Sequence, residues 1–213
     1  MNKSVDAYLS IQSPYCYFAV PRLKRLAEIP AVSVQFKPVM PGVLRIADAF
    51  TDRDTMEQDY FILDVQRTAQ FLGIPYKEAD PYPVAFKPGS LWIAEPDQPR
   101  VWRLLDLLMA ASFLGSGLEL YDRLMRLIWD GNTRNWHLGD HIAQAVSAAG
   151  LELAELDNLI DAQKDHFRAD LLANNKALLD AGHWGVPCCV FEGEPFYGQD
   201  RLDQLAWRMG VVL

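Results

Sequence analysis

The hydrophobic and polar positions divide the chain into three parts. In the first part, residues 5–11 alternate as a strand does, 15–28 carry hydrophobic residues at helical spacing, and 31–36 are rich in β-branched residues between two prolines. This order predicts a strand, a crossover helix and a second, parallel strand. Pro21 lies inside the predicted helix, where a proline removes a hydrogen bond and favours a kink.

The middle of the chain shows the helical period with few strand signals, and the end returns to short strands. The middle predicts helices at residues 55–72, 100–114, 117–129, 138–149 and 154–181, with a proline- and aromatic-rich irregular connection at 75–99. The end predicts strands at 188–191 and 195–197 and a final helix to about residue 209, capped by Asp200.

This order of elements predicts an α/β fold. Joined across the helical block, the two ends give a βαβ…ββα order, which is the thioredoxin-like topology with an inserted all-helical domain. Residues 1–54 and 182–213 would form the discontinuous thioredoxin-like domain, and residues 55–181 the helical insertion. An unrelated α/β protein with a helical appendage fits the element order equally well.

Composition narrows the possible partners. The 213 residues are 50% hydrophobic and 23% charged, as in a globular protein, with a formal net charge of −8. Nucleic acid and anionic membranes require clustered positive charge, so we expect a small-molecule substrate and neither of those partners. No segment approaches the roughly 20 apolar residues of a membrane span, and the N-terminus lacks the apolar segment of a signal peptide. We therefore expect a cytoplasmic protein, with a homodimer as the usual state for such enzymes.

The cysteines and histidines do not predict a disulfide framework or a metal site. The cysteines are Cys16, Cys188 and Cys189, an odd number with an adjacent pair and without a C-x-x-C motif. His137 and His141 would share one face of a helix, but no third ligand accompanies them.

The segment Ser13-Pro14-Tyr15-Cys16 lies where the first strand turns into the first helix. Serine is favoured as an N-cap and proline at the first helical position, so capping alone would explain the motif. The same helix end presents unpaired N–H groups and a positive dipole to an anion. A thiolate there that also accepted a hydrogen bond from Ser13 would have a lowered pKa. Since serine cannot exchange disulfides, the thiol would come from a bound cofactor, which indicates glutathione.

Two further motifs lie near the C-terminus. Pro187, in Gly-Val-Pro before an apolar strand, cannot donate to a ladder and is either a turn residue or the cis-proline of a thioredoxin fold. A cis bond would leave the backbone groups of Val186 facing the site. Gln199 and Asp200 precede the last helix, where Asp200 either caps the helix or, with Gln199, binds the charged γ-glutamyl end of glutathione.

Together these motifs resemble the 2-hydroxychromene-2-carboxylate isomerases and their relatives, the kappa-class glutathione transferases, within the wider group of bacterial disulfide oxidoreductases that carry a helical insertion. The resemblance extends nearly end to end, over segments 13–15, 37–39, 72–75, 182–187 and 197–202.

The resemblance implies a role for each of these residues. Ser13 would activate the glutathione sulfur, Val186 and cis-Pro187 would contact the cysteinyl part, and Gln199 and Asp200 would hold the γ-glutamyl end. It implies a glutathione-dependent isomerase of an aromatic or unsaturated keto acid, in which thiolate addition permits rotation about a former double bond. A kappa-class-like transferase is the alternative, because the same thiolate serves conjugation. A disulfide oxidoreductase, which Ser13 disfavours, and a non-catalytic glutathione-binding module are the remaining interpretations.

The sequence departs from these families on the substrate side. Their Asn-x-Pro-Pro type segment is missing from residues 46–54, Cys16 replaces a usual serine, and two cysteines follow Pro187 where threonine is common. Four aromatic residues could line a substrate pocket, although each is more often a core residue. They are Tyr15, Phe50, Trp92 and Trp184.

Overall fold

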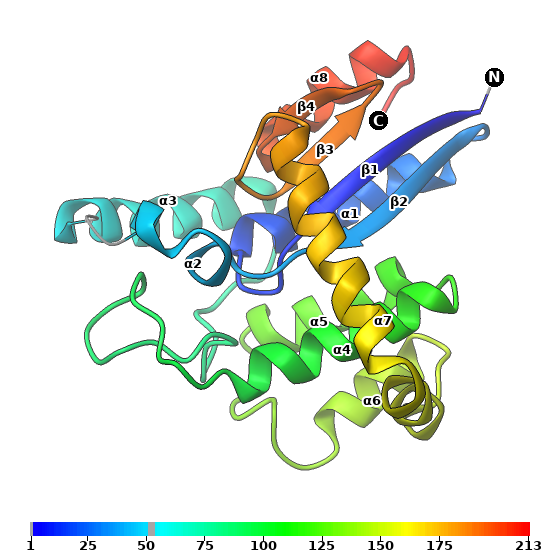
Figure 1. The fold of residues 1–213 in the computed structure, drawn as a ribbon. Helices are drawn as coiled ribbons and strands as arrows, with labels where there is room; N and C mark the ends of the chain where they lie inside the picture. Colours follow the sequence, from blue (N-terminus) through cyan, green and yellow to red (C-terminus); the bar gives the residue numbers. More distant parts are fainter. Residues whose placement is uncertain (1, 51–53) are drawn as a thin grey trace.

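The computed structural model describes residues 2–50 and 54–213, and every predicted helix and strand is present with small shifts at its ends (Figure 1). The elements are β1 (Lys3–Leu9), α1 (Pro14–Glu28), β2 (Val32–Pro38), α2 (Gly42–Arg45), a 3-10 turn (Ala47–Phe50), α3 (Thr55–Leu72), α4 (Pro99–Phe113), α5 (Gly117–Trp129), α6 (His141–Ala148), α7 (Leu153–Asp180), β3 (Cys188–Phe191), β4 (Glu194–Tyr197), a 3-10 turn (Gln199–Arg201) and α8 (Leu202–Met209). The short helix α2 was not predicted.

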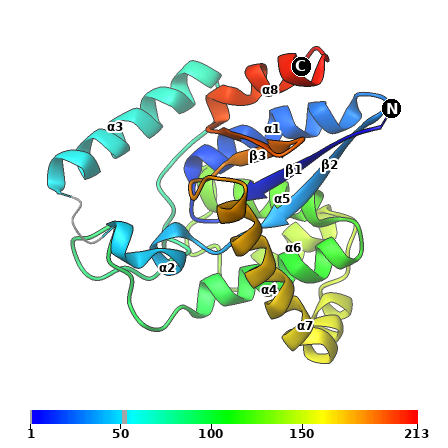
Figure 2. The same cartoon turned by 45° about the horizontal axis from the view of Figure 1, so that its top comes forward.

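The strands form one mixed sheet in the order β2-β1-β3-β4. β1 pairs in parallel with β2, from Lys3 opposite Val32 to Leu9 opposite Pro38, and antiparallel with β3, which pairs antiparallel with β4. α1 and α8 lie along one side of the sheet, and α7 crosses the other (Figure 2). This is the thioredoxin fold with a helical insertion, as the element order predicted.

Alternate residues of β1 point to opposite faces of the sheet. Val5, Ala7 and Leu9 belong to the main core, whereas Tyr8 packs in a second cluster that includes Leu178 of α7. The main core also contains large side chains of the insertion, so one core runs through both parts of the chain. The domain limits at 54/55 and 181/182 therefore stay a prediction.

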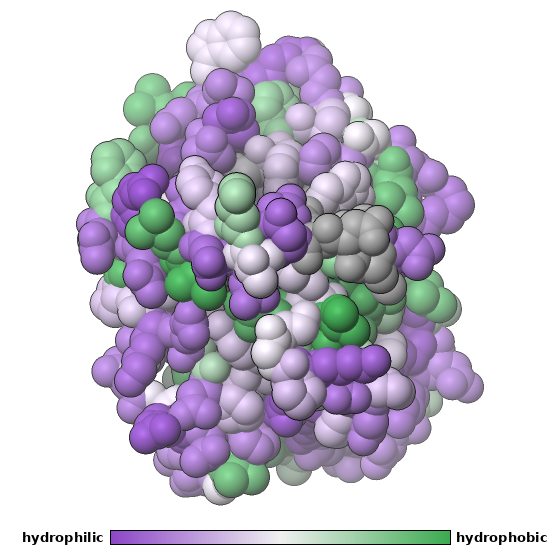
Figure 3. Space-filling model, turned by 90° about the vertical axis from the view of Figure 1, so that its left-hand side faces the viewer, coloured by the Kyte–Doolittle hydropathy of each residue, from purple (hydrophilic) through white to green (hydrophobic). Residues whose placement is uncertain are grey.

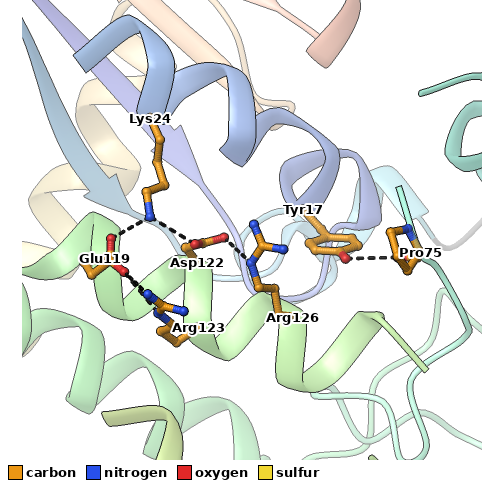
Figure 4. A network of polar contacts seen from close by, with 7 residues as sticks. All are labelled: Tyr17, Lys24, Pro75, Glu119, Asp122, Arg123 and Arg126. Carbon is orange, nitrogen blue, oxygen red and sulfur yellow. Dashed lines mark hydrogen bonds and ion pairs between the residues drawn. The ribbon is translucent and has the colours of Figure 1, made fainter. Parts of the chain in front are cut away.

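Ion pairs join α1 to the insertion (Figure 4). Lys24 on α1 binds Glu119 at 2.6 Å and Asp122 at 3.1 Å, both on α5. Asp122 is only 3% exposed and also accepts a 2.9 Å hydrogen bond from Arg126. Buried carboxylates need such partners, so this network fixes the position of α1 against the insertion.

Pro21 does not interrupt α1, whereas α7 is irregular at one residue. α1 continues through Pro21 as one helix, whereas α7 contains a non-helical residue, Gln163, with φ −130° and ψ 18°.

Within the described residues, no helix has both the length and the apolar composition that crossing a bilayer requires.

Candidate functional site

A cavity of about 200 Å³ lies where β1 ends and α1 begins. Its walls come from the start of α1, α2, α3, the irregular connection after α3 and the loop before β3. The residues that line it include Ser13, Tyr15, Arg45, Phe50, Phe61, Glu78, Trp92, Trp184, Val186 and Tyr197. Figure 3 shows the side of the molecule on which α2 and α3 lie, where hydrophobic residues are scattered among hydrophilic ones.

Ser13 is the N-cap of α1, with φ −94° and ψ 116°. Its Oγ accepts a 3.3 Å hydrogen bond from the backbone N–H of Cys16. A hydroxyl that accepts through its oxygen still has its proton to donate, and Ser13 lines the cavity. The N–H of Tyr15 at the first turn has no acceptor inside the helix. The helix tip therefore offers two donors and a positive dipole end to an anion.

Cys16 lies one turn further along α1 and points into the core. It is 0% exposed, and its Sγ accepts a 3.5 Å hydrogen bond from the backbone of Ser10. Burial raises the pKa of the Cys16 thiol to about 12. Cys188 and Cys189 are also buried free thiols, and burial raises both of their pKa values. Thiolates are the reactive form, so none of these three cysteines suits nucleophilic chemistry near neutral pH.

The loop before β3 completes the wall opposite Ser13. The Val186–Pro187 peptide bond is cis, as the thioredoxin topology predicted. Val186 lines the cavity together with Ser13, and Pro187 is buried beside it. The carbonyl of Pro187 accepts a 2.8 Å hydrogen bond from the N–H of Gly198, so this loop is tied to the segment that follows β4.

Gln199 and Asp200 lie outside the cavity lining, in the 3-10 turn after Gly198. The backbone carbonyl of Gln199 accepts a 3.3 Å hydrogen bond from Arg22, and Asp200 pairs with Arg201. The prediction that Asp200 caps the last helix is wrong. The 3-10 turn intervenes, and the N-cap of α8 is Arg201. The structure thus brings Ser13 and Val186 to one cavity and leaves Gln199 and Asp200 on an adjoining turn.

Aromatic side chains form most of the cavity wall. Phe50 stacks on Trp92 with ring centroids 5.8 Å apart and meets Trp184 edge-on at 6.0 Å. Trp92 in turn meets Phe61 edge-on at 5.4 Å. All four aromatic residues named from the sequence line the cavity. The sequence analysis did not name the further aromatic lining residues as candidates for the pocket, and they come from α3, the irregular connection, α5 and β4: Phe61, Tyr76, Tyr82, Phe86, Trp129 and Tyr197.

Arg45 at the end of α2 is the functional candidate that the sequence reasoning missed. Its Nε donates to the carbonyl of Met40 at 2.7 Å, and its Nη2 to the carbonyl of Trp184 at 2.9 Å. Its Nη1 is buried without a hydrogen-bond partner. Burial lowers the pKa of this guanidinium, which still stays charged at neutral pH. No periodic pattern surrounds Arg45, so nothing in the sequence distinguished it from a surface arginine.

The described residues bear on a possible metal site and on part of the 46–54 segment. Among the described residues, no group of three or more histidine, cysteine, aspartate or glutamate side chains is arranged to hold a metal ion. Residues 51–53 of the segment that lacks the Asn-x-Pro-Pro motif lie outside the described residues.

The fold and this site define a thioredoxin-like protein with a serine at the N-terminus of its first helix. A family model of the DSBA-like thioredoxin domain matches residues 4–210. The chain therefore belongs to the DSBA-like thioredoxin family. A search of curated protein sequences finds no significant match.

Solved structures resemble this chain over nearly its whole length. A 2-hydroxychromene-2-carboxylate isomerase is 20% identical with a TM-score of 0.68, covering 97% of this chain and 94% of its own. A probable DsbA oxidoreductase from Streptomyces coelicolor is 17% identical with a TM-score of 0.66, covering 99% and 92%. The cytosolic disulfide reductase DsbM from Pseudomonas aeruginosa, in a structure with GSH, is 16% identical with a TM-score of 0.62, covering 98% and 100%. At these identities the comparisons establish the fold, which serves both isomerases and oxidoreductases.

Proposed function

We propose that this protein is a glutathione-dependent isomerase of the 2-hydroxychromene-2-carboxylate isomerase type, acting on an aromatic or unsaturated keto acid. The observation that carries the proposal is which side chain reaches the cavity at the N-terminus of α1. A hydroxyl, Ser13, faces the cavity there, while the thiol of Cys16 is 0% exposed with a pKa raised by burial to about 12. Thiol chemistry at this site would therefore have to use the sulfur of a bound cofactor.

The residues around the cavity fit glutathione. The Ser13 hydroxyl and the Tyr15 N–H supply donors for a sulfur anion, and the backbone of Val186 lies on the same cavity. The hydrogen bond between Pro187 and Gly198 connects that wall to the turn that holds Gln199 and Asp200. Asp200 would hold the ammonium of the γ-glutamyl end, sharing its carboxylate with Arg201. The structural neighbour DsbM, solved with GSH, supports binding of this tripeptide in the family.

Bound glutathione would supply a nucleophilic thiolate. Ser13 would hold its hydroxyl proton toward the sulfur and so stabilise the anion, which lowers the thiol pKa. The aromatic walls would orient a planar substrate and exclude water, so that the electrostatic effect of the helix tip is stronger than in solvent. Phe50, Trp92 and Trp184 would supply those walls.

A kappa-class-like glutathione transferase is the second candidate. The aromatic stack of Phe50 on Trp92 favours planar apolar electrophiles, which are suitable conjugation substrates. An oxidoreductase mechanism would need a thiol at position 13, and the residue there is serine.

Calorimetry and two assays test the proposal. We expect glutathione and S-methylglutathione both to bind, since the tripeptide contacts do not require a free thiol. Only glutathione should support interconversion of 2-hydroxychromene-2-carboxylate and its open trans form. Conjugation of 1-chloro-2,4-dinitrobenzene without isomerisation would instead identify a transferase. Reduction of insulin disulfides in the absence of glutathione would contradict both.

A further inference from the structure

The positively charged guanidinium of Arg45 lies against the cavity in a fixed orientation. Its hydrogen bonds to the carbonyls of Met40 and Trp184 fix two of the three guanidinium nitrogens. These carbonyls belong to the loop after β2 and to the loop before β3, and Trp184 of the second loop lines the cavity. An arginine fork held in this way loses little conformational entropy when it binds a further group.

The charge of Arg45 has no counter-ion in the part of the chain that the structure describes. No carboxylate forms an ion pair with it, and its Nη1 is shielded from solvent without a protein acceptor. Among the described residues, Arg45 is the only lysine, arginine or histidine that lines the cavity, and the only acidic lining residue, Glu78, is exposed. A buried polar group without a hydrogen-bond partner is unfavourable, and more so when it carries a charge, so Nη1 is placed to take an anionic acceptor.

The neighbours of Arg45 indicate what kind of anion the cavity accepts. Phe50, Trp92 and Trp184 line the same cavity as Arg45 and contact one another, and their aromatic surface favours a planar ring. The cavity volume of about 200 Å³ exceeds the roughly 150 Å³ that holds benzene, and so admits one ring with a short side chain. Guanidinium groups match the planar geometry of carboxylates.

We propose that the guanidinium of Arg45 binds the carboxylate of a small aromatic acid whose ring lies against Phe50, Trp92 and Trp184. As a statement about the substrate, this inference rests on the proposed function, because it names the residue that recognises the acid. As a statement about binding, it does not require glutathione. A purely structural Arg45, which only fastens two loops, would not distinguish a carboxylate from a neutral group of the same shape.

The test compares trans-cinnamate with trans-cinnamamide, its neutral counterpart, by calorimetry in the absence of glutathione. The unmodified protein should bind cinnamate at least tenfold more tightly than cinnamamide. Arg45→Gln should remove that preference without weakening cinnamamide binding, and Arg45→Lys should retain part of it. Arg100→Gln is the matched control. Arg100 is a partly buried arginine that donates to the carbonyl of Tyr82 at 3.0 Å and does not line the cavity, so the preference should survive its replacement.

Equal binding of the two probes by the unmodified protein would overturn the inference, and this arm does not depend on whether a variant folds. Absence of cinnamate binding would overturn it as well. Calorimetry of glutathione on the same proteins separates the two proposals. If glutathione fails to bind but the cinnamate preference depends on Arg45, the cofactor assignment is wrong and the carboxylate site stands. If Arg45→Gln abolishes glutathione binding and leaves the cinnamate preference intact, Arg45 belongs to the cofactor and the inference is wrong.

Discussion

The Tyr15 hydroxyl donates a 2.6 Å hydrogen bond to the carboxylate of Asp64, which joins the first turn of α1 to the middle of α3. Burial, and then the hydrogen bond to Asp64, raises the pKa of Tyr15, so the phenol stays protonated and remains a donor. α3 buries few of its own side chains, with Val65 and Ala69 the buried ones among those described. This contact therefore helps to hold α3 in place as a wall of the cavity.

Tyr15→Phe should loosen that wall. The substitution keeps the ring, which meets Phe61 edge-on at 5.9 Å, and removes only the donor to Asp64. We expect faster amide exchange in the first half of α3, and a KM for the aromatic substrate that rises several-fold while kcat changes little. Tyr60→Phe is the control, because Tyr60 lies on the same helix and is 60% exposed. Unchanged exchange in the Tyr15 variant would show that packing alone fixes α3.

Ser13→Ala should raise the pKa of the thiol of bound glutathione and reduce turnover, because the hydroxyl donor to the sulfur is lost. The alanine also removes the cap that accepts from Cys16, which costs about 1 kcal/mol of the free energy of unfolding. The ultraviolet absorbance of the thiolate, followed against pH in the complex with glutathione, measures the first effect. Thermal unfolding measures the second.

Asp54→Ala separates capping from catalysis. Asp54 caps α3 by accepting a 2.9 Å hydrogen bond from Glu57, so its loss should cost a comparable amount of stability. The thiol titration of this variant should match that of the unmodified protein.

Ser13→Thr keeps a hydroxyl and should retain part of the lowered pKa of the glutathione thiol. If Ser13→Ala left the titration unchanged, the role given to Ser13 would be wrong.

Local signals explain why some elements could be predicted from the sequence to the residue. α3 occupies residues 55–72, as its hydrophobic period predicted, because Asp54 supplies its N-cap and Gly73 ends it with a left-handed φ of 64°. Ser13 and Pro14 likewise mark the start of α1. At such positions the residues that decide the conformation are adjacent in the chain.

Long-range contacts explain what the sequence could not show. Arg45 became a candidate only when the fold brought it beside Trp184, 139 positions away along the chain. The cap assigned to Asp200 failed because Arg201 donates a 3.1 Å backbone hydrogen bond to Gly198, which tightens the segment into a 3-10 turn. Whether Gln199 and Asp200 bind glutathione depends on how the tripeptide crosses that turn, and remains a prediction.

The three cysteines should resist thiol reagents in the native protein. At pH 8 a thiol with a pKa of about 12, as at Cys16, is almost entirely protonated, and burial similarly raises the pKa of Cys188 to about 11. Ellman's reagent should therefore detect almost no thiol until the protein is unfolded, when all three titrate. Ser13→Cys provides the contrast. A thiol at the helix tip should have a lowered pKa and react rapidly at pH 7. Rapid reaction of Cys16 in the unmodified protein would reopen the disulfide oxidoreductase interpretation.

The ion pairs between α1 and α5 should make stability depend on pH in the acid range (Figure 4). The hydrogen bond from Lys24 lowers the pKa of Glu119 below its ordinary value of 4.5. A carboxyl group whose pKa is lower in the folded state stabilises the protein above the pKa of the unfolded chain. That contribution disappears as the pH falls through the lower, folded-state pKa.

Glu119→Gln tests this relationship by urea unfolding at pH 7, 5 and 3. Because the side chain is 34% exposed, we expect a loss of about 0.5–1 kcal/mol at pH 7. The loss should shrink toward pH 3, where the carboxyl of the unmodified protein begins to take up its proton. In a Lys24→Met background the same substitution should have a much smaller effect, since the principal donor is already absent. A loss that stayed constant from pH 7 to pH 3 would mean that the Glu119 side chain stabilises α5 by packing and not by its charge.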